Sequence, residues 1–237
     1  MGLTTSLLPA TNAYAAELGL APFASHQALL EASTMLVASY RAFDEVDAPA
    51  PTVVHVGPMR TAAGTGSTWR RTTDRPLVLV GLSTSHQNQI PLLQRLCDAL
   101  GVLDVEALVT TGPSIAPELL RPASNTTVFP FVAHDEVLPS ADLLVTHAGH
   151  GTVMAGVAHG VPMLCLPMGR DQPLIADRAA RLGVGAVASC EASVAELRDA
   201  IVALLADAGV RRRARAFAES LRDHPGLDHA VGLVENC

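Results

Sequence analysis

Charged and aromatic side chains are scarce in this chain. Charged residues make up 16% and aromatic residues 3% of its 237 residues, whereas hydrophobic residues make up 49%. This balance excludes global disorder and predicts a sizeable core built mainly from Ala, Leu and Val. The formal net charge of −7 argues against a broad surface for nucleic acid or an anionic membrane. The main basic cluster, residues 211–215, is typical of a solvated helix face.

The chain also lacks the usual signals of secretion and of membrane insertion. Its four cysteines form no Cys-x-x-Cys motif and lie far apart, which is typical of reduced thiols in a cytoplasmic protein. They are Cys97, Cys165, Cys190 and Cys237. No run of about 20 apolar residues could span a bilayer, and the N-terminus has no basic start of a signal peptide. We therefore expect a cytoplasmic protein that binds neither membranes nor nucleic acid.

Short apolar runs alternate with segments of helical periodicity between residues 76 and 221. The runs that predict strands are residues 77–82, 106–111, 126–132, 143–145, 163–166 and 185–188. The segments that predict helices are residues 89–100, 114–120, 135–138, 151–159, 174–182, 194–206 and 210–221. This alternation predicts an α/β fold, a Rossmann-like parallel sheet with helices on both faces. Ligands of such sheets bind at the carboxyl ends of the strands.

The flanking segments are too short for an independent core. Residues 1–60 contain candidate helices at 12–19 and 27–32 and candidate strands at 35–38 and 52–56. Residues 61–75 are rich in Gly, Thr, Ser and Ala without apolar periodicity, which indicates a flexible linker. Residues 222–237 are expected to form a C-terminal tail.

A glycine-rich turn follows the apolar run 143–145. It contains His147, Gly149, His150, Gly151 and Thr152, at the point where a helix must begin. The start of a helix presents unpaired backbone N–H groups and a partial positive charge, and glycine lets an anion approach that backbone closely. The turn therefore predicts a diphosphate site.

Two common phosphate motifs are absent from this turn. Met154 stands where a dinucleotide fingerprint needs its third glycine, and no Gly-Lys-Ser/Thr of a P-loop occurs. The His147-x-x-His150 pair lacks a third zinc ligand nearby, so we expect no metal site. Considered alone, His147 is also consistent with a histidine that caps the turn. Asp171 and Gln172 are likewise consistent with a helix N-cap before Pro173.

Three further motifs follow the turn in order: Gly160-Val161-Pro162, Pro167 and Asp171-Gln172. Together with the turn they resemble the nucleotide-sugar signature of family 1 glycosyltransferases. These include plant and animal UDP-glycosyltransferases and actinobacterial macrolide and antibiotic glycosyltransferases. The resemblance implies that residues 76–221 form the C-terminal donor domain of a two-domain GT-B fold. It also implies that residues 1–60 are a remnant of the acceptor domain with the interdomain segment.

The resemblance implies a role for each matching position. The diphosphate would be bound by His147, Gly149, His150, Gly151, Thr152, Ser83 and Thr84. The nucleobase would lie against Phe131, the backbone of Val132, and His134. The sugar hydroxyls would be bound by Asp171 and Gln172. The resemblance implies no metal and no cofactor, since the nucleotide sugar is a co-substrate.

Two of the departures from the family pattern bear on the donor and on catalysis. Plant-type members carry a ribose-holding Glu where this chain has Ala155, so a 2′-deoxyribose donor such as a dTDP-sugar becomes more plausible beside UDP. The acceptor domain normally supplies the catalytic histidine base, and no segment here corresponds to it. We therefore expect no catalytic base in this chain.

The resemblance implies a metal-independent, inverting hexosyltransferase of natural products. It would transfer a hexose from a UDP- or dTDP-sugar to a hydroxyl of a small-molecule acceptor. This chain alone would bind the donor but not complete the transfer, and its partner would be an acceptor-domain chain or a second copy of itself. The first alternative is a non-catalytic nucleotide- or partner-binding module. The second is a nucleotide-sugar epimerase or cell-wall-precursor glycosyltransferase of the same architecture, for which Asp171 alone supplies an evident acid–base group.

Overall fold

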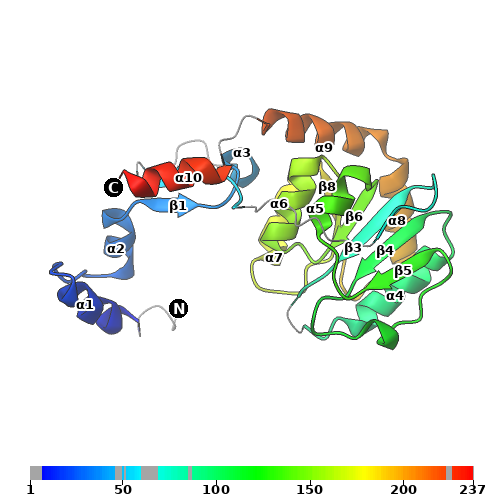
Figure 1. Ribbon diagram of the computed structural model, residues 1–237, viewed down its shortest axis with the longest axis horizontal. Coiled ribbons are helices and arrows are strands. Elements are labelled where there is room, and N and C mark those ends of the chain that lie inside the picture. The colour runs from blue at the N-terminus through cyan, green and yellow to red at the C-terminus, as the bar shows by residue number, and fades with distance from the viewer. Residues whose placement is uncertain are drawn as a thin grey trace. The chain divides into compact units, whose positions relative to one another are not determined.

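The chain folds into two compact units. The computed structural model describes residues 7–45, 50, 52–59, 69–84, 87–222 and 226–236. One unit comprises residues 1–59 and 225–237, and the other comprises residues 60–224 (Figure 1). Across the described ranges, no helix combines the length and the apolar character needed to cross a bilayer.

The larger unit is built on a six-stranded parallel sheet, which confirms the predicted fold class. The strand order is β5-β4-β3-β6-β7-β8. The strands are β3 (Leu77–Gly81), β4 (Glu106–Thr110), β5 (Thr126–Phe129), β6 (Leu143–Thr146), β7 (Met163–Cys165) and β8 (Gly185–Val187). The chain runs outward from β3 to β5 and then returns to the other side of β3 at β6. This reversal places a topological switch point between β3 and β6, where sheets of this kind bind ligands.

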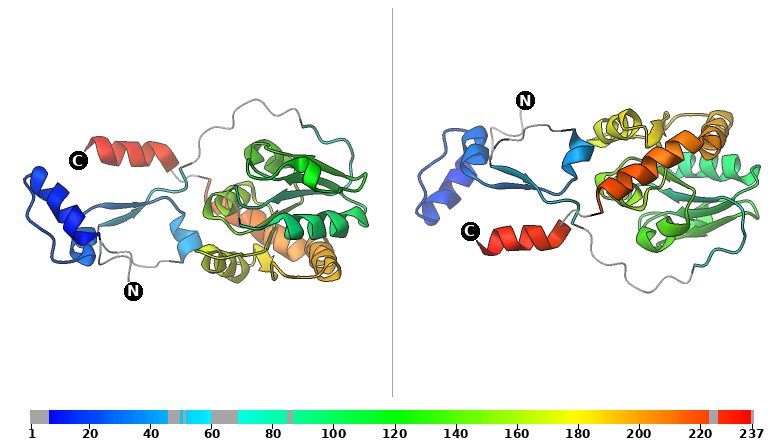
Figure 2. Two further views of the ribbon diagram at one scale, coloured as in Figure 1. Left: turned by 90° about the horizontal axis from the view of Figure 1, so that it is seen from below. Right: turned by 90° about the horizontal axis from the view of Figure 1, so that it is seen from above.

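Helices cover both faces of this sheet (Figure 2). On one face, alternate strand residues such as Val78, Val80 and Val145 share a core with α4 (Ile90–Gly101) and α8 (Val194–Ala206). On the other face, Gly156 of α6 (His150–His159) packs closely on Leu144 and Met163. The remaining helices of this unit are η1 (Pro117–Leu119), α5 (His134–Val137), η2 (Leu138–Ser140), α7 (Gln172–Arg181) and α9 (Ala208–Ser220).

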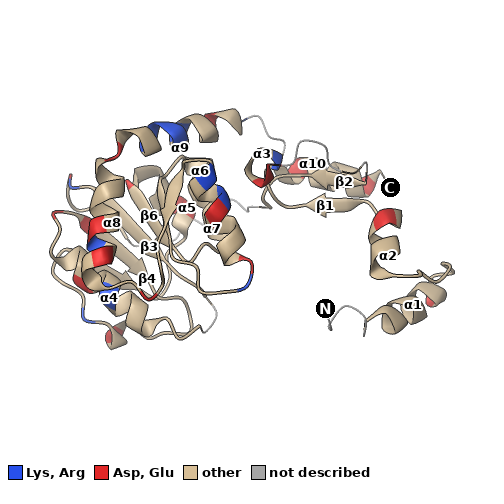
Figure 3. Ribbon diagram, turned by 180° about the vertical axis from the view of Figure 1, so that it is seen from behind, with Lys and Arg blue, Asp and Glu red and all other residues tan. Residues whose placement is uncertain are grey.

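Local sequence signals explain where several helices begin and end. Ser193 and Glu196 form a capping box at the start of α8. Gly160 ends α6 in the left-handed conformation with φ 65°. The basic residues 211–215 lie on α9, and three of the four arginines are exposed, as predicted for a solvated face (Figure 3).

Two predicted elements are shorter than expected. The predicted strand 126–132 ends at Phe129, because Pro130 cannot donate a hydrogen bond to a neighbouring strand. The predicted helix 114–120 is only the 3₁₀ turn η1. Of the predicted linker, residues 61–68 lie outside the described residues. Thr72 and Thr73 donate backbone and hydroxyl hydrogen bonds to the Glu106 carboxylate, so this end of the segment is anchored to β4.

The smaller unit contains the elements predicted for residues 1–60 and two more helices, α3 and α10. Its elements are α1 (Leu8–Glu17), α2 (His26–Ala32), β1 (Met35–Val37), α3 (Arg41–Asp44), β2 (Val53–His55) and α10 (Gly226–Glu235). The two strands pair in parallel, and all six of their residues are half-buried. The segment that we expected to be a C-terminal tail therefore contains a helix.

Candidate functional site

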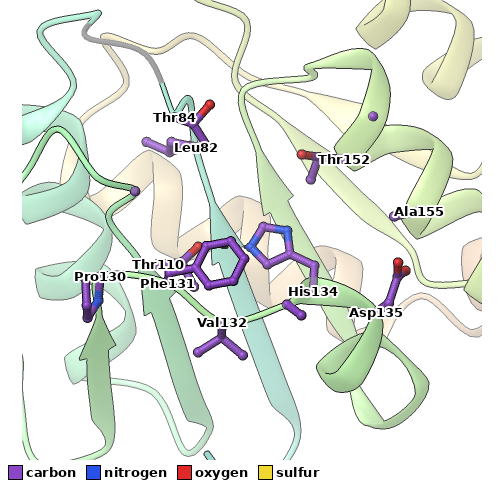
Figure 4. A pocket seen from close by; sticks show the side chains of 13 residues that line it. Leu82, Thr84, Thr110, Pro130, Phe131, Val132, His134, Asp135, Thr152 and Ala155 are labelled. Carbon is purple, nitrogen blue, oxygen red and sulfur yellow. Dashed lines mark hydrogen bonds between the residues drawn. The ribbon is translucent and has the colours of Figure 1, made fainter. Parts of the chain in front are cut away.

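A cavity of about 460 Å³ opens at the carboxyl end of the sheet, at the switch point (Figure 4). Its walls come from the loops after β3, β4 and β5 and from the first turns of α6. The lining residues are Leu82, Thr84, Thr110, Gly112, Pro130, Phe131, Val132, Ala133, His134, Asp135, Gly151, Thr152 and Ala155. Six of the sequence-predicted site residues are among them: Thr84, Phe131, Val132, His134, Gly151 and Thr152.

The start of α6 forms one wall of the cavity. Its N-cap is Gly149, which has no side chain to cap the helix, so the first backbone N–H groups are available to a ligand. A Cβ atom placed on Gly151 would meet only open space. This is the geometry that an anion needs in order to reach the amides and the partial positive charge of a helix start.

Backbone strain is concentrated in the loops at this end of the sheet. Four non-glycine residues in the described ranges have positive φ, and three of them follow β3, β6 and β7. They are Asn88 (φ 52°), Ala148 (φ 63°) and Arg170 (φ 60°). Such conformations cost on the order of 1–3 kcal/mol each and occur often in ligand-binding loops.

Phe131 gives the cavity an aromatic wall. Its side chain is 72% exposed although it lies beside the buried Val132, which is 4% exposed. The ring stands at the carboxyl end of β5, on the opposite side of the cavity from Thr152 (Figure 4). An exposed aromatic ring in a cavity is suited to stack on a planar base.

His134 is half-buried and lies over the end of β3. A side chain on Gly81 would collide with its imidazole ring. The Thr110 hydroxyl donates to the Val80 carbonyl at 3.1 Å and lies 3.0 Å from His134 Nε2. Because the hydroxyl has only one proton, Nε2 must be the donor in the second bond. Burial lowers the pKa of His134, with a smaller opposing effect from Asp135, so the ring is held neutral.

His147 lies beneath the turn rather than in the cavity lining. It is 9% exposed, and a side chain on Gly149 would collide with its ring. Burial lowers its pKa, while the Gly81 backbone and the charge of Asp171 act in the opposite direction. Its Nδ1 is buried and has no hydrogen-bond partner among the described residues. The ring therefore supports the glycine turn, and Nε2 is its nitrogen nearest to Gly149 at the start of α6.

The other predicted diphosphate residues divide between the cavity and the loop interior. Thr84 is exposed in the cavity, whereas Ser83 is buried and its backbone N–H and C=O bond to the Gln89 side chain. His150 is half-buried at the first position of α6 and does not line the cavity. The residues that complete this loop, Ser85 and His86, lie outside the described residues.

The predicted sugar residues lie at the start of α7, outside the cavity lining. Asp171 is exposed at the N-cap position, and its side chain makes no capping hydrogen bond. Gln172 is 2% exposed, and its Oε1 accepts from the backbone N–H groups of Met168 (2.8 Å) and Gly169 (3.1 Å). In this structure Gln172 thus holds its own loop together, and the exposed carboxylate is the group that faces solvent.

Several lining residues were not anticipated from the sequence. Leu82, Thr110 and Gly112 come directly at or after the ends of β3 and β4. Their place at strand ends was the available signal, but nothing in their chemistry marks them. Asp135 was also missed, and it bonds to His159 at the far end of α6.

Within the described ranges, no group of three or more His, Cys, Asp or Glu residues could hold a metal ion.

Residues 94–235 match the family described as Erythromycin biosynthesis protein CIII-like, C-terminal domain. The chain is 33% identical over 162 residues to the oleandomycin glycosyltransferase of Streptomyces antibioticus. This alignment covers 67% of this chain and 38% of that enzyme.

Two solved structures are similar in fold. The structure of the glycotransferase of kitacinnamycin matches with a TM-score of 0.84 and 26% identity, covering 98% of this chain and 62% of its own. The glycosyltransferase VinC, in complex with dTDP, matches with a TM-score of 0.63 and 24% identity, covering 76% of this chain and 45% of its own. In each of these three comparisons the chain spans less than two thirds of the relative's length.

Proposed function

Because the chain belongs to the family of Erythromycin biosynthesis protein CIII-like C-terminal domains, we propose that its larger unit binds a nucleoside-diphosphate sugar for glycosyl transfer. Its larger unit has the sheet of GT-B glycosyltransferases. The proposed donor is a UDP- or dTDP-hexose, and the proposed acceptor is a hydroxyl group of a small molecule. The proposed chemistry needs no metal ion.

The observation that carries this proposal is a single cavity with two unlike walls. One wall is the open start of α6, with Gly151 and Thr152, and the other holds the exposed ring of Phe131. A nucleoside diphosphate has the matching pair of ends, a planar base and an anionic diphosphate. The cavity volume of about 460 Å³ lies in the range of small-molecule sites.

In the proposed reaction, a base removes the proton of the acceptor hydroxyl, the hydroxyl oxygen attacks the anomeric carbon from the far side, and the nucleoside diphosphate leaves. Negative charge then grows on the phosphate oxygens. The backbone N–H groups and partial positive charge at the start of α6, with the Thr152 hydroxyl, would stabilise that charge. The general base would come from an acceptor domain, so this chain alone would bind the donor without efficient transfer.

Isothermal titration of the chain with UDP and with dTDP tests the proposal. We expect saturable binding of at least one of them. Replacing Phe131 by Ala should weaken that binding about fivefold or more, because stacking on a base contributes about 1–3 kcal/mol. Leu119→Ala is the matched control, because Leu119 is a 57% exposed apolar side chain that does not line the cavity. A folded sample that binds neither nucleotide would refute the proposed function.

A further inference from the structure

The cavity has a carboxylate beside the position where the family resemblance expects one. Ala155 stands in place of a ribose-holding Glu, and both Ala155 and Asp135 line the cavity. The two residues lie on the same wall, and the Asp135 carboxylate points toward Ala155 (Figure 4). The small alanine side chain leaves room for a carboxylate that comes from a different element.

Asp135 is held in this position by the far end of α6. His159 Nε2 lies 3.2 Å from Asp135 Oδ1, and the two side chains are only 25% and 26% exposed. His159 is four residues after Ala155, so both lie on the same face of α6. One helix face therefore presents a small residue and, one turn later, the anchor of the carboxylate.

The pentose of a bound nucleotide would come to this part of the wall. In a nucleoside diphosphate the pentose lies between the base and the phosphates, hence between Phe131 and Gly151 in the proposed binding mode. Ala155 is four residues after Gly151, which is about 6 Å along a helix axis. That separation is about the width of one sugar ring, so the pentose hydroxyls would face Ala155 and Asp135.

Resting on the donor site proposed above, we propose that Asp135, positioned by His159, accepts a hydrogen bond from a pentose hydroxyl of the bound nucleotide. A carboxylate has two oxygens and can accept further bonds while His159 holds one of them. A hydrogen bond to a charged group in a mostly buried site is stronger than one between neutral groups. Asp135 would thus supply from α5 what a Glu at position 155 would supply from α6.

Nucleotides without the hydroxyls test this assignment on the full chain. By isothermal titration, UDP is compared with 2′,3′-dideoxyuridine diphosphate, and dTDP with 3′-deoxythymidine diphosphate. The wild-type chain should bind the hydroxylated member about tenfold more tightly or better, as expected for a hydrogen bond to a charged group. Asp135→Ala should bind the two members of each pair with nearly equal affinity. Asp135→Asn, which keeps a neutral acceptor, should give an intermediate preference.

Two further variants separate the role of Asp135 from a general loss of structure or charge. Glu136→Gln removes a charge from the next residue of α5, which does not line the cavity, and should keep the wild-type preference for the hydroxyl. His159→Leu should reduce that preference, whereas His159→Gln, which restores a donor, should recover much of it. Loss of packing alone would weaken the binding of both members of each nucleotide pair and leave the ratio of their affinities unchanged.

The possible failures of the two proposals differ. Equal binding of both members of each pair by the wild-type chain would overturn the role of Asp135 while leaving the donor site in place. Retention of the hydroxyl preference by Asp135→Ala would do the same. If Asp135→Ala does not fold, the hydroxyl preferences of the wild-type chain and of Asp135→Asn still test the role of Asp135. Binding of neither UDP nor dTDP by the wild-type chain would remove the donor site and this assignment with it.

Discussion

Gly81 is the residue around which the two neutral histidines are arranged. It ends β3 and lies between Thr110 of β4 and Thr146 of β6 in the strand register. The His134 ring covers it, and its backbone interacts with His147. Burial lowers the pKa of both histidines, and the charge of His147 lowers the pKa of His134 further. The site is therefore built for imidazole rather than imidazolium.

This arrangement predicts that the free energy of unfolding falls when the pH is lowered from 7.5 to 5.5. Unfolded histidine has a pKa of about 6.5, and both folded values lie below it, so the unfolded chain binds more protons in this range. The stabilisation is complete above about pH 6.5 and is lost as the pH falls toward the folded values. Each histidine contributes a slope of at most about 1.4 kcal/mol per pH unit.

Urea denaturation at the two pH values measures this slope. His134→Gln, which keeps a donor near Thr110 but does not titrate, should show a smaller slope than the wild-type chain. His229→Gln removes an exposed histidine of α10 and should leave the slope unchanged. Burial raises the pKa of Glu106, but hydrogen bonds from Thr72 and Thr73 outweigh that effect and lower it overall. The Glu106 carboxyl therefore titrates below the range from pH 5.5 to 7.5. A stability that does not change between pH 7.5 and 5.5 would contradict the prediction.

At the scale of elements, the start of α6 combines two properties that a single substitution can separate. Gly151 lies in the first turn, where a Cβ atom would meet only open space. Gly151→Ala should therefore leave the fold intact and raise helix stability by up to about 1 kcal/mol. The same methyl group would occupy the space through which a diphosphate approaches the backbone amides. We therefore predict that Gly151→Ala raises the free energy of unfolding and weakens nucleotide binding.

Thermal denaturation and titration with UDP and dTDP measure the two effects separately. Gly232→Ala is the matched control, because Gly232 also lies in a helix and a Cβ atom there would also meet open space. It should raise stability in the same way and leave nucleotide binding unchanged. Unaltered nucleotide affinity in Gly151→Ala would show that the diphosphate does not approach this turn.

The sequence predicted elements better than it predicted contacts between them. The apolar runs and the helical spacing were sufficient to predict the sheet, because a strand that is buried on both faces has a continuous apolar sequence. Phe131 was assigned through the family resemblance, and it lies just after Pro130, beyond the end of β5. The inward side chain of Gln172 depends on the conformation of its own loop, and the pairing of Asp135 with His159 depends on tertiary packing. Periodicity encodes neither. Sequence-based roles are therefore least secure for polar residues at helix ends.

At the scale of the whole molecule, every residue that lines the cavity belongs to the larger unit. That unit also contains all six strands of the sheet and the helices on both of its faces. The smaller unit contributes a two-stranded sheet with only half-buried strands, which is too little to form a core alone. Nucleotide binding and the smaller unit should therefore be separable.

We predict that a fragment of residues 69–222 folds and binds the nucleotide with an affinity within about twofold of the full chain, because every residue that lines the cavity lies within it. Circular dichroism would establish the fold, and titration with UDP and dTDP would establish the affinity. Phe131→Ala within the fragment should weaken binding by the same factor as in the full chain, which ties the measured site to this cavity. A fragment that folds but loses binding would show that the smaller unit contributes to the donor site. In that case the cavity of the larger unit would be only part of the surface that recognises the nucleotide.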